Sequence, residues 1–188
     1  TWAARKPSSP CAPDRRLPYH LGMDPRYPTG RFAYDSDVTP EKRAAWVAVI
    51  GSFPAELKDV LAVLNPARVD TPYRPGGWTG RQVVHHVADS HMNAYVRFRL
   101  ALTEDEPPVK PYAEDRWAEL VDARTEDPAV SVGILDGVHR RWHTLLASLQ
   151  PGDFERTLKH PEHGTITLDW LLQLYAWHGR HHLGHLGL

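Results

Sequence analysis

The chain has 188 residues and carries 22 basic and 23 acidic side chains, so its formal net charge is -1 and no nucleic-acid partner is expected. Its length suits one ordinary domain, and no stretch approaches the roughly 18 unbroken apolar residues of a membrane span, so we expect neither a membrane anchor nor a secretion signal. The single cysteine, Cys11, excludes an internal disulfide and a thiolate zinc cage, which makes a reducing cytoplasm the expected compartment.

The two ends of the chain differ from the rest. Residues 1–26 are rich in Pro, Arg and Ser without a hydrophobic period, so we expect them to be disordered or to lie outside the domain, with Met23 as a candidate natural start. At the other end the apolar pattern still runs at Leu188, without the Gly or Pro that normally ends a helix. The expected domain therefore spans residues 27–188 and is expected to be cut short at its C-terminus.

Two amphipathic helices are predicted in the first half of the chain, because apolar residues recur there at steps of three and four. The first runs from about Pro40 to Leu64, and Pro54 inside it predicts a kink or a break. The second begins after Thr79, a candidate N-cap, and ends before Pro107. Each helix has one apolar stripe to bury.

The second half of the chain carries two more helical patterns. One spans about Ala129 to Leu149, and the other starts after Thr167 and runs to the end of the chain. A short helix is predicted over Glu114 to Val121, and alternating residues around a Pro-Glu-His-Gly turn predict a small β-hairpin near Arg156 to Ile166. The expected fold is therefore all-α, a four-helix bundle with a small β-hairpin before the last helix.

The last predicted helix contains four histidines, His178, His181, His182 and His185. At about 100° per residue, His178 and His182 lie within roughly 60° of the apolar stripe and point inward, whereas His181 lies near 120° away and His185 points more outward. Two imidazoles at i and i+4 have the spacing to bind one metal ion. The alternative is that both are buried core histidines with backbone or carboxylate partners.

A metal site in a bundle needs a third ligand from a facing helix. The second helix offers His85, His86 and His91, and periodicity does not decide among them, because His91 is centred on the apolar stripe and the other two flank it. Four further histidines are expected on the surface or in loops, namely His139, His143, His160 and His163. Three neutral imidazoles without a carboxylate would favour a catalytic site with an open position over a structural one.

Several motifs resemble the YfiT group of the DinB-like superfamily, from about Tyr27 to the last residue. They are "DTPYRPGGWTGRQVVHHVADSHMNAYVRFRLALTEDEPPVKPY", "RWAEL", "RWHTLL", "HPEHG" and "LYAWHGRHHLGHL". The resemblance implies a four-helix bundle, commonly a homodimer, that binds one nickel or zinc ion through three histidines. The family's second-helix ligand lies eight residues after the Trp of "GWT", which is His86 here, with His85 as the fallback, and its last-helix pair matches His178 and His182.

The group is described both as metal-dependent hydrolases and as bacillithiol transferases. A thiol that binds an exposed divalent ion loses its proton at neutral pH and can attack an electrophile. No Glu stands between His178 and His182 as a general base for hydrolysis, so we expect S-transfer between a small thiol and an electrophilic substrate. A hydrolase and a non-enzymatic metal-binding module remain the alternatives. Possible orienting residues lie on the second helix: Asp89, Asn93, Arg97 and Arg99.

Overall fold

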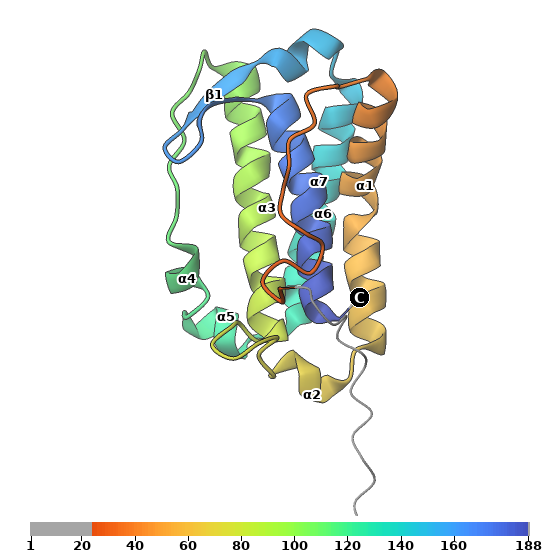
Figure 1. Ribbon diagram of the computed structural model, residues 1–188, viewed down its shortest axis with the longest axis vertical. Coiled ribbons are helices and arrows are strands. Elements are labelled where there is room, and N and C mark those ends of the chain that lie inside the picture. Colours follow the sequence, from red (N-terminus) through yellow and green to blue (C-terminus); the bar gives the residue numbers. More distant parts are fainter. Residues whose placement is uncertain (1–23, 188) are drawn as a thin grey trace, which may run out of the picture.

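Four long helices lie side by side in the computed structural model, which describes residues 24–187 (Figure 1). They are α1 (Pro40–Val63), α3 (Gly80–Thr103), α6 (Pro128–Ser148) and α7 (Leu168–Leu186). The predicted four-helix bundle is confirmed. The expectations for Cys11, Met23, Leu188 and the disorder of residues 1–23 lie outside the described residues. No helix of residues 24–187 combines the length and the apolar character needed to cross a membrane.

Threonine side chains set the starts of three long helices. The hydroxyl groups of Thr39, Thr79 and Thr167 accept hydrogen bonds from backbone N–H groups in the first turns of α1, α3 and α7. Such bonds satisfy N–H groups that have no partner within the helix. For α3 the bond is part of a capping box with Gln82, whose side chain accepts from the backbone of Thr79.

Two local predictions need correction. Pro54 does not break its helix, because α1 continues through it from Pro40 to Val63. The last helix does have a glycine terminator: Gly187 adopts a left-handed conformation with φ of 105° and caps α7. This conformation is open to glycine because it lacks a Cβ atom.

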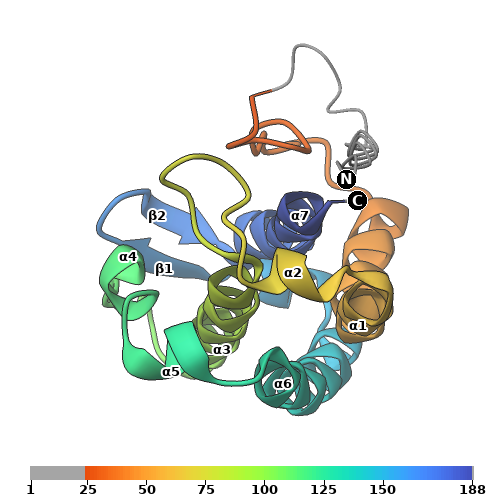
Figure 2. The same ribbon diagram turned by 90° about the horizontal axis from the view of Figure 1, so that it is seen from below.

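The order of the four long helices around the bundle differs from their order in the sequence. α6 and α7 each pack against both α1 and α3, so α1 and α3 lie diagonally opposite one another (Figure 2). The connections between α1 and α3 and between α3 and α6 carry short helices. They are α2 (Pro66–Val69), which was not predicted, and α4 (Glu114–Trp117) and α5 (Val121–Thr125), which replace the single short helix expected there.

The predicted small antiparallel hairpin is confirmed and lies beside α3 and α7 (Figure 1). It consists of β1 (Thr157–His160) and β2 (Gly164–Thr167), with Thr157 paired to Thr167 and His160 to Gly164. The 3-10 helix η1 (Pro151–Glu155), which was not predicted, precedes it. Because β2 runs directly into α7, the hairpin is tied to the start of that helix.

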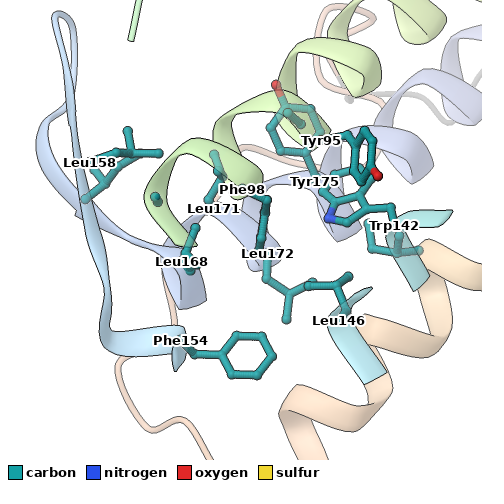
Figure 3. Close-up of a cluster of buried hydrophobic side chains, with 14 of the residues drawn as sticks. Tyr95, Phe98, Trp142, Leu146, Phe154, Leu158, Leu168, Leu171, Leu172 and Tyr175 are labelled. Atoms are coloured by element: carbon teal, nitrogen blue, oxygen red, sulfur yellow. The ribbon is translucent and has the colours of Figure 1, made fainter. Parts of the chain in front are cut away.

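The core consists of two apolar clusters, one toward each end of the bundle. The cluster near the hairpin is rich in aromatic and leucine side chains and is drawn in Figure 3. The other gathers Phe53, Leu57, Val60, Val83, Val84, Val87, Ala88, Leu135, Leu183 and Leu186. Between the residues of the two clusters, α3, α6 and α7 each carry a histidine: His91, His139 and His178. A polar layer therefore crosses an otherwise apolar core.

An extended segment before α1, residues 24–39, runs along α7 (Figure 1). The Phe32 ring meets the Trp170 ring edge-on at 5.3 Å between centroids. Gln173 makes two hydrogen bonds to the backbone of Asp35, accepting its N–H at 2.9 Å and donating to its carbonyl oxygen at 3.0 Å. One face of α7 that would otherwise meet solvent is thereby covered.

Candidate metal centre

The structure brings together the three histidines expected to bind a metal. One ring nitrogen from each of His86, His178 and His182 lies within 4.8 Å of the others. His86 comes from α3, and the other two occupy successive turns of α7. The Nε2 atoms of His178 and His182 are only 3.1 Å apart, so this i,i+4 pair faces one point, as its spacing predicted.

The arrangement fits a divalent ion. Imidazole nitrogens lie about 2.0–2.1 Å from a bound zinc ion, so the ligands of one ion lie within about 4 Å of each other. The observed limit of 4.8 Å is close to that spacing. Among the described residues, Nδ1 of His86 is buried without a hydrogen-bond partner. Neutral imidazole nitrogens are among the commonest ligands of zinc and nickel.

Burial keeps these imidazoles neutral. It lowers the pKa of His86 to about 4, helped by the nearby His185 and His181. Burial, followed by the charges of neighbouring imidazoles, also lowers the pKa values of His178 and His182 well below the ordinary value. A neutral ring offers a lone pair, so the group is ready to bind a cation at neutral pH.

His85, the fallback ligand on α3, is placed elsewhere. Its Nδ1 atom is 2.7 Å from the hydroxyl oxygen of Ser131, and its Nε2 atom is 3.1 Å from the carbonyl oxygen of Glu126. Both ring nitrogens thus have partners at the start of α6. The geometry therefore favours His86 over His85 as the third member of the group.

A second group of histidines shares His182 with the first. Ring nitrogens of His181, His182 and His185 also lie within 4.8 Å of one another. The expectation that His185 points outward is wrong, since the side chains of His181 and His185 are both buried. The ring of Trp177 stacks on His181 at 4.5 Å, and that of Tyr73 stacks on His185 at 4.1 Å.

An open cleft of about 420 Å³ reaches the first group but not the second. His178 forms part of its wall, whereas His181 and His185 do not. The other lining residues come from α3, the α3–α4 connection, α4, the hairpin and α7. They are Ser90, Arg97, Pro111, Tyr112, Ala113, Glu114, Asp115, Arg116, His160, Glu162, His163, Ile166, Trp170, Leu171, Leu174 and Tyr175.

Of the four polar residues singled out on α3, only Arg97 lines this cleft. Its side chain is buried, with one long hydrogen bond of 3.5 Å to the carbonyl oxygen of Lys110. Asp89 lies outside the cleft, and burial together with the charge of Asp122 raises its pKa to about 6. Asn93 bonds back to the carbonyl oxygen of Asp89, and Arg99 donates to the Tyr95 hydroxyl.

Two histidines expected on the surface are buried. His139 is 1% exposed, and its ring nitrogens make hydrogen bonds to groups inside the bundle. His160 lines the cleft from the hairpin. His143 and His163 are exposed, as expected. His160, Glu162 and His163 form a third cluster that could hold a metal, but two of its three members are exposed.

A larger groove of about 580 Å³ lies between α3 and α6. Three arginines line it, Arg99, Arg140 and Arg141, together with hydroxyl and apolar side chains. It contains none of the clustered histidines and no acidic side chain. The smaller cleft is therefore the better candidate for chemistry.

Comparison with known sequences gives consistent matches over most of the chain. The family model of the DinB superfamily matches residues 52–186. A protein of Bacillus mycoides strain KBAB4 is 51% identical over 163 residues, which cover 87% of this chain and 94% of that protein. A protein of Bacillus cereus strain B4264 matches with the same identity and coverage. Both are provisionally named metal-dependent hydrolases.

Solved structures agree with the fold. YfiT from Bacillus subtilis, described as a probable metal-dependent hydrolase with an unusual four-helix bundle topology, is 44% identical with a TM-score of 0.84. The match covers 87% of this chain and 94% of that one. A mycothiol-dependent maleylpyruvate isomerase is 18% identical with a TM-score of 0.63, covering 80% of this chain and 62% of its own. The second match concerns the fold alone.

Proposed function

Since the chain belongs to the DinB superfamily, we propose that it is a metal-dependent enzyme that joins a small thiol, through its sulfur, to an electrophilic substrate. The observation that carries the proposal is a group of three neutral imidazoles of which one, His178, lines the wall of an open cleft. Structural zinc sites normally close with a fourth protein ligand, whereas catalytic sites keep a position open. An open cleft beside three histidines supports the catalytic type.

In this proposal His86, His178 and His182 hold one nickel or zinc ion. When bound, the ion supplies a Lewis acid that lowers the pKa of a coordinating thiol, so that the thiolate is present at neutral pH. The imidazoles carry no charge of their own, so they leave the double charge of the ion uncompensated. The overall reaction forms a sulfur–carbon bond and releases the displaced group and the thiol proton.

Side chains of the cleft would bind and orient the substrates. Arg97 supplies a buried guanidinium for an anionic group, since none of its contacts within residues 24–187 is an ion pair. The Tyr112 hydroxyl is buried, with no hydrogen-bond partner in the described part of the chain, and is available as a donor. The hydroxyls of Ser90 and Tyr175, 3.3 Å apart, complete a polar wall beside His178.

Transfer is favoured over hydrolysis because the histidine group contains no carboxylate. A hydrolase normally places a general base beside the attacking water. The acidic residues of the cleft are Glu114, Asp115 and Glu162, and none of them belongs to the histidine group, although burial raises the pKa of Glu114. The provisional names of the relatives favour hydrolysis, so this activity is the second candidate.

The test compares the two activities in one preparation. Protein purified without a nickel column is loaded with zinc or nickel and mixed with small thiols and an alkyl chloride such as monochlorobimane. We expect metal-dependent formation of the thioether, with release of chloride and a proton, and its loss on chelation. Hydrolysis of 4-nitrophenyl acetate that needs the metal and is indifferent to thiols would reject transfer in favour of hydrolysis.

A control variant and a stability measurement separate catalysis from a structural ion. His143→Ala changes an exposed histidine of α6 and should leave thioether formation as in the wild type. If the ion were structural, chelation would unfold the bundle. We expect the chelated protein to keep its helical circular dichroism, because two apolar clusters pack without the ion.

The resemblance also leads us to propose a homodimer, and the single cysteine leads us to propose a reducing compartment such as the cytoplasm. Light scattering of the purified full chain would measure the mass in solution. A mass near twice 21.3 kDa is expected, and a mass of one chain would reject the dimer.

A further inference from the structure

A chain of hydrogen-bonded imidazoles crosses the bundle through the candidate metal centre. It starts on α7, passes to α3 and α6, and ends on a backbone carbonyl of α1, so that all four long helices take part. The successive contacts are His185 Nδ1 to His182 Nδ1 at 3.2 Å, His182 Nε2 to His178 Nε2 at 3.1 Å, His178 Nδ1 to His91 Nε2 at 3.0 Å, His91 Nδ1 to His139 Nε2 at 2.8 Å, and His139 Nδ1 to the Ile50 carbonyl oxygen at 2.6 Å.

The carbonyl at the end fixes the direction of every bond. The Ile50 oxygen can only accept, so Nδ1 of His139 must carry the proton and donate. A neutral imidazole has one N–H and one acceptor nitrogen, so Nε2 of His139 accepts from Nδ1 of His91. By the same rule Nε2 of His91 accepts from Nδ1 of His178. Nε2 of His178, on the side of His182, is left with its lone pair.

Pro54 explains why the Ile50 carbonyl is free to end the chain. In an α-helix the carbonyl of residue 50 would accept the N–H of residue 54. Proline has no N–H, so this helical bond is missing inside α1. The Nδ1–H group of His139 takes its place from α6 at 2.6 Å. A proline that would otherwise leave a buried acceptor unsatisfied thus creates the anchor of the chain.

The surroundings hold the middle of the chain in place. His91 and His139 are each 1% exposed, and neither has a carboxylate partner, so a charged ring would be costly there. The ring of Phe53 packs on both, at 5.1 and 5.4 Å between centroids. Gly179 permits this, because a Cβ atom there would lie 2.7 Å from the Phe53 ring. These contacts restrict the rotation of the two rings.

We propose that His91 and His139 are positioning residues that hold His178 as the Nδ1–H tautomer, with its Nε2 lone pair presented to the metal centre. The inference rests on the proposed function only in taking His86, His178 and His182 as the ligands. Hydrogen bonds from a metal-binding histidine to a second group fix its tautomer and orientation, and loss of such partners costs about 10–100-fold in metal affinity.

The other end of the chain must behave differently. In the metal-free protein, Nε2 of His182 donates to Nε2 of His178, and Nδ1 of His185 donates to Nδ1 of His182. An ion shared by the two Nε2 atoms needs a lone pair on both. The proton of His182 must then sit on Nδ1 and donate to His185, whose own proton moves to Nε2. No proton is gained or lost, and His178 keeps its tautomer.

Nitrogen NMR of the histidine rings tests this on the wild-type full chain. Long-range proton–nitrogen spectra distinguish protonated from bare ring nitrogens. In protein freed of metal by a chelator, we expect protons on Nδ1 of His139, His91 and His178 and on Nε2 of His182. After one equivalent of zinc, His182 should change to Nδ1–H while His178 does not. A proton on Nε2 of His178 in the metal-free protein would overturn the proposal.

Zinc affinity, measured by competition with a chelating dye, tests the anchor. His139→Phe keeps a ring of similar size but removes both hydrogen bonds. It should weaken zinc binding about tenfold, the lower end of the range for direct partners of a ligand, because His139 acts on His178 through His91. His139→Gln, which can still donate and accept, should recover part of that loss. His143→Phe, one turn further along α6 and exposed, is the matched control and should bind as the wild type does.

The outcomes separate this proposal from the proposed function. If zinc binds and His139→Phe binds it within twofold of the wild type, the positioning role is wrong even though the site exists. If zinc does not bind at His86, His178 and His182, the proposed function fails. The tautomers in protein treated with a chelator still decide whether the chain of hydrogen-bonded imidazoles exists. The NMR measurement needs no variant, so a failure of His139→Phe to fold would not remove the test.

Discussion

The two histidine groups of α7 share one ring, His182, but differ in what lies beside them. The open group, His86, His178 and His182, reaches a cleft of about 420 Å³ through His178, which forms part of the cleft wall. The group of His181 and His185 is covered by aromatic rings, Trp177 on one and Tyr73 on the other. Both have ring nitrogens close enough to hold an ion. Ligand type and spacing therefore do not distinguish a catalytic metal site from a buried cluster, whereas access to a cleft does.

The largest expected effect is on zinc affinity, when a histidine of the open group is replaced. We expect His86→Ala to weaken zinc binding by more than about 100-fold, beyond the range typical of outer hydrogen-bond partners, because it removes a direct ligand. His181→Ala should change the affinity only severalfold. Dye competition on both variants gives the two constants. Equal losses would contradict the assignment of the ion to His86, His178 and His182, and a larger loss for His181→Ala would place it in the covered group of His181, His182 and His185.

Both groups contain buried neutral histidines, so both should make the free energy of unfolding depend on pH. Burial lowers the pKa of His86, in the open group, to about 4, and that of His185, in the covered group, also to about 4. In the unfolded chain both titrate near 6.5. Between pH 6.5 and 4 the unfolded state therefore binds more protons, so the free energy of unfolding falls as the pH falls through this window. Above pH 6.5 this effect is absent.

For His86 the expected loss in the metal-free protein is about 3 kcal/mol between pH 6.5 and 4. Urea unfolding of the chelated protein at a series of pH values measures it. His86→Gln and His185→Gln should each flatten the profile, although only the first should strongly weaken zinc binding. A wild-type profile that is flat across this window would contradict neutral burial of the histidines.

The fold was largely predictable because it depends on local signals. The apolar periods located the four long helices, and Thr79 and Thr167 marked two of their starts. Proline proved ambiguous: Pro54 predicted a kink or a break, yet a helix can tolerate proline when another group takes the free carbonyl. That group is His139, which lies 89 residues after Ile50 in the sequence, so no local pattern could reveal it.

The candidate site was less predictable. The pair His178 and His182 followed from helical spacing, but His86 rested on resemblance alone, and only the tertiary structure separates it from His85. The burial of His181 and His185 depends partly on Tyr27 and Tyr73, which come from segments outside α7. A helical wheel of α7 considers only α7 itself, so it could not predict this burial. The cleft joins the hairpin, α3 and α7, so the roles of Tyr112 and His160 carried no signal in sequence spacing.

A smaller effect, on the KM for an anionic thiol, is expected when Arg97 of the cleft is replaced. Its buried guanidinium lines the cleft beside the open group, so Arg97→Gln should raise the KM for a thiol that carries a carboxylate about tenfold, with little change for an uncharged thiol. Arg99→Gln, two residues further along α3, is the control because Arg99 lines the other groove. Steady-state thioether formation with mercaptosuccinate and 2-mercaptoethanol measures both. An unchanged preference would exclude Arg97 from binding the thiol.

The smallest expected effect comes from Pro54→Ala, a change on α1, which carries none of the clustered histidines. The new N–H group at position 54 can bond the Ile50 carbonyl within α1, and His139 must then share its acceptor. The chain of hydrogen bonds from the Ile50 carbonyl reaches His178 of the open group, whereas Nδ1 of His181 in the covered group has no hydrogen-bond partner among residues 24–187. A weaker anchor should therefore lower zinc affinity about threefold, less than the loss of a whole outer partner.

A matched control for Pro54→Ala is Ser52→Ala, an exposed change on the same helix that leaves the Ile50 carbonyl untouched. Because alanine favours the helix more than proline does, a fall in zinc affinity could not be attributed to a weaker α1. The ring nitrogens of His139 should shift in the NMR spectrum of Pro54→Ala but not in that of Ser52→Ala. If Pro54→Ala leaves both these resonances and the zinc affinity unchanged, the missing helical bond in α1 has no part in preparing the metal centre, and the anchor must be sought elsewhere.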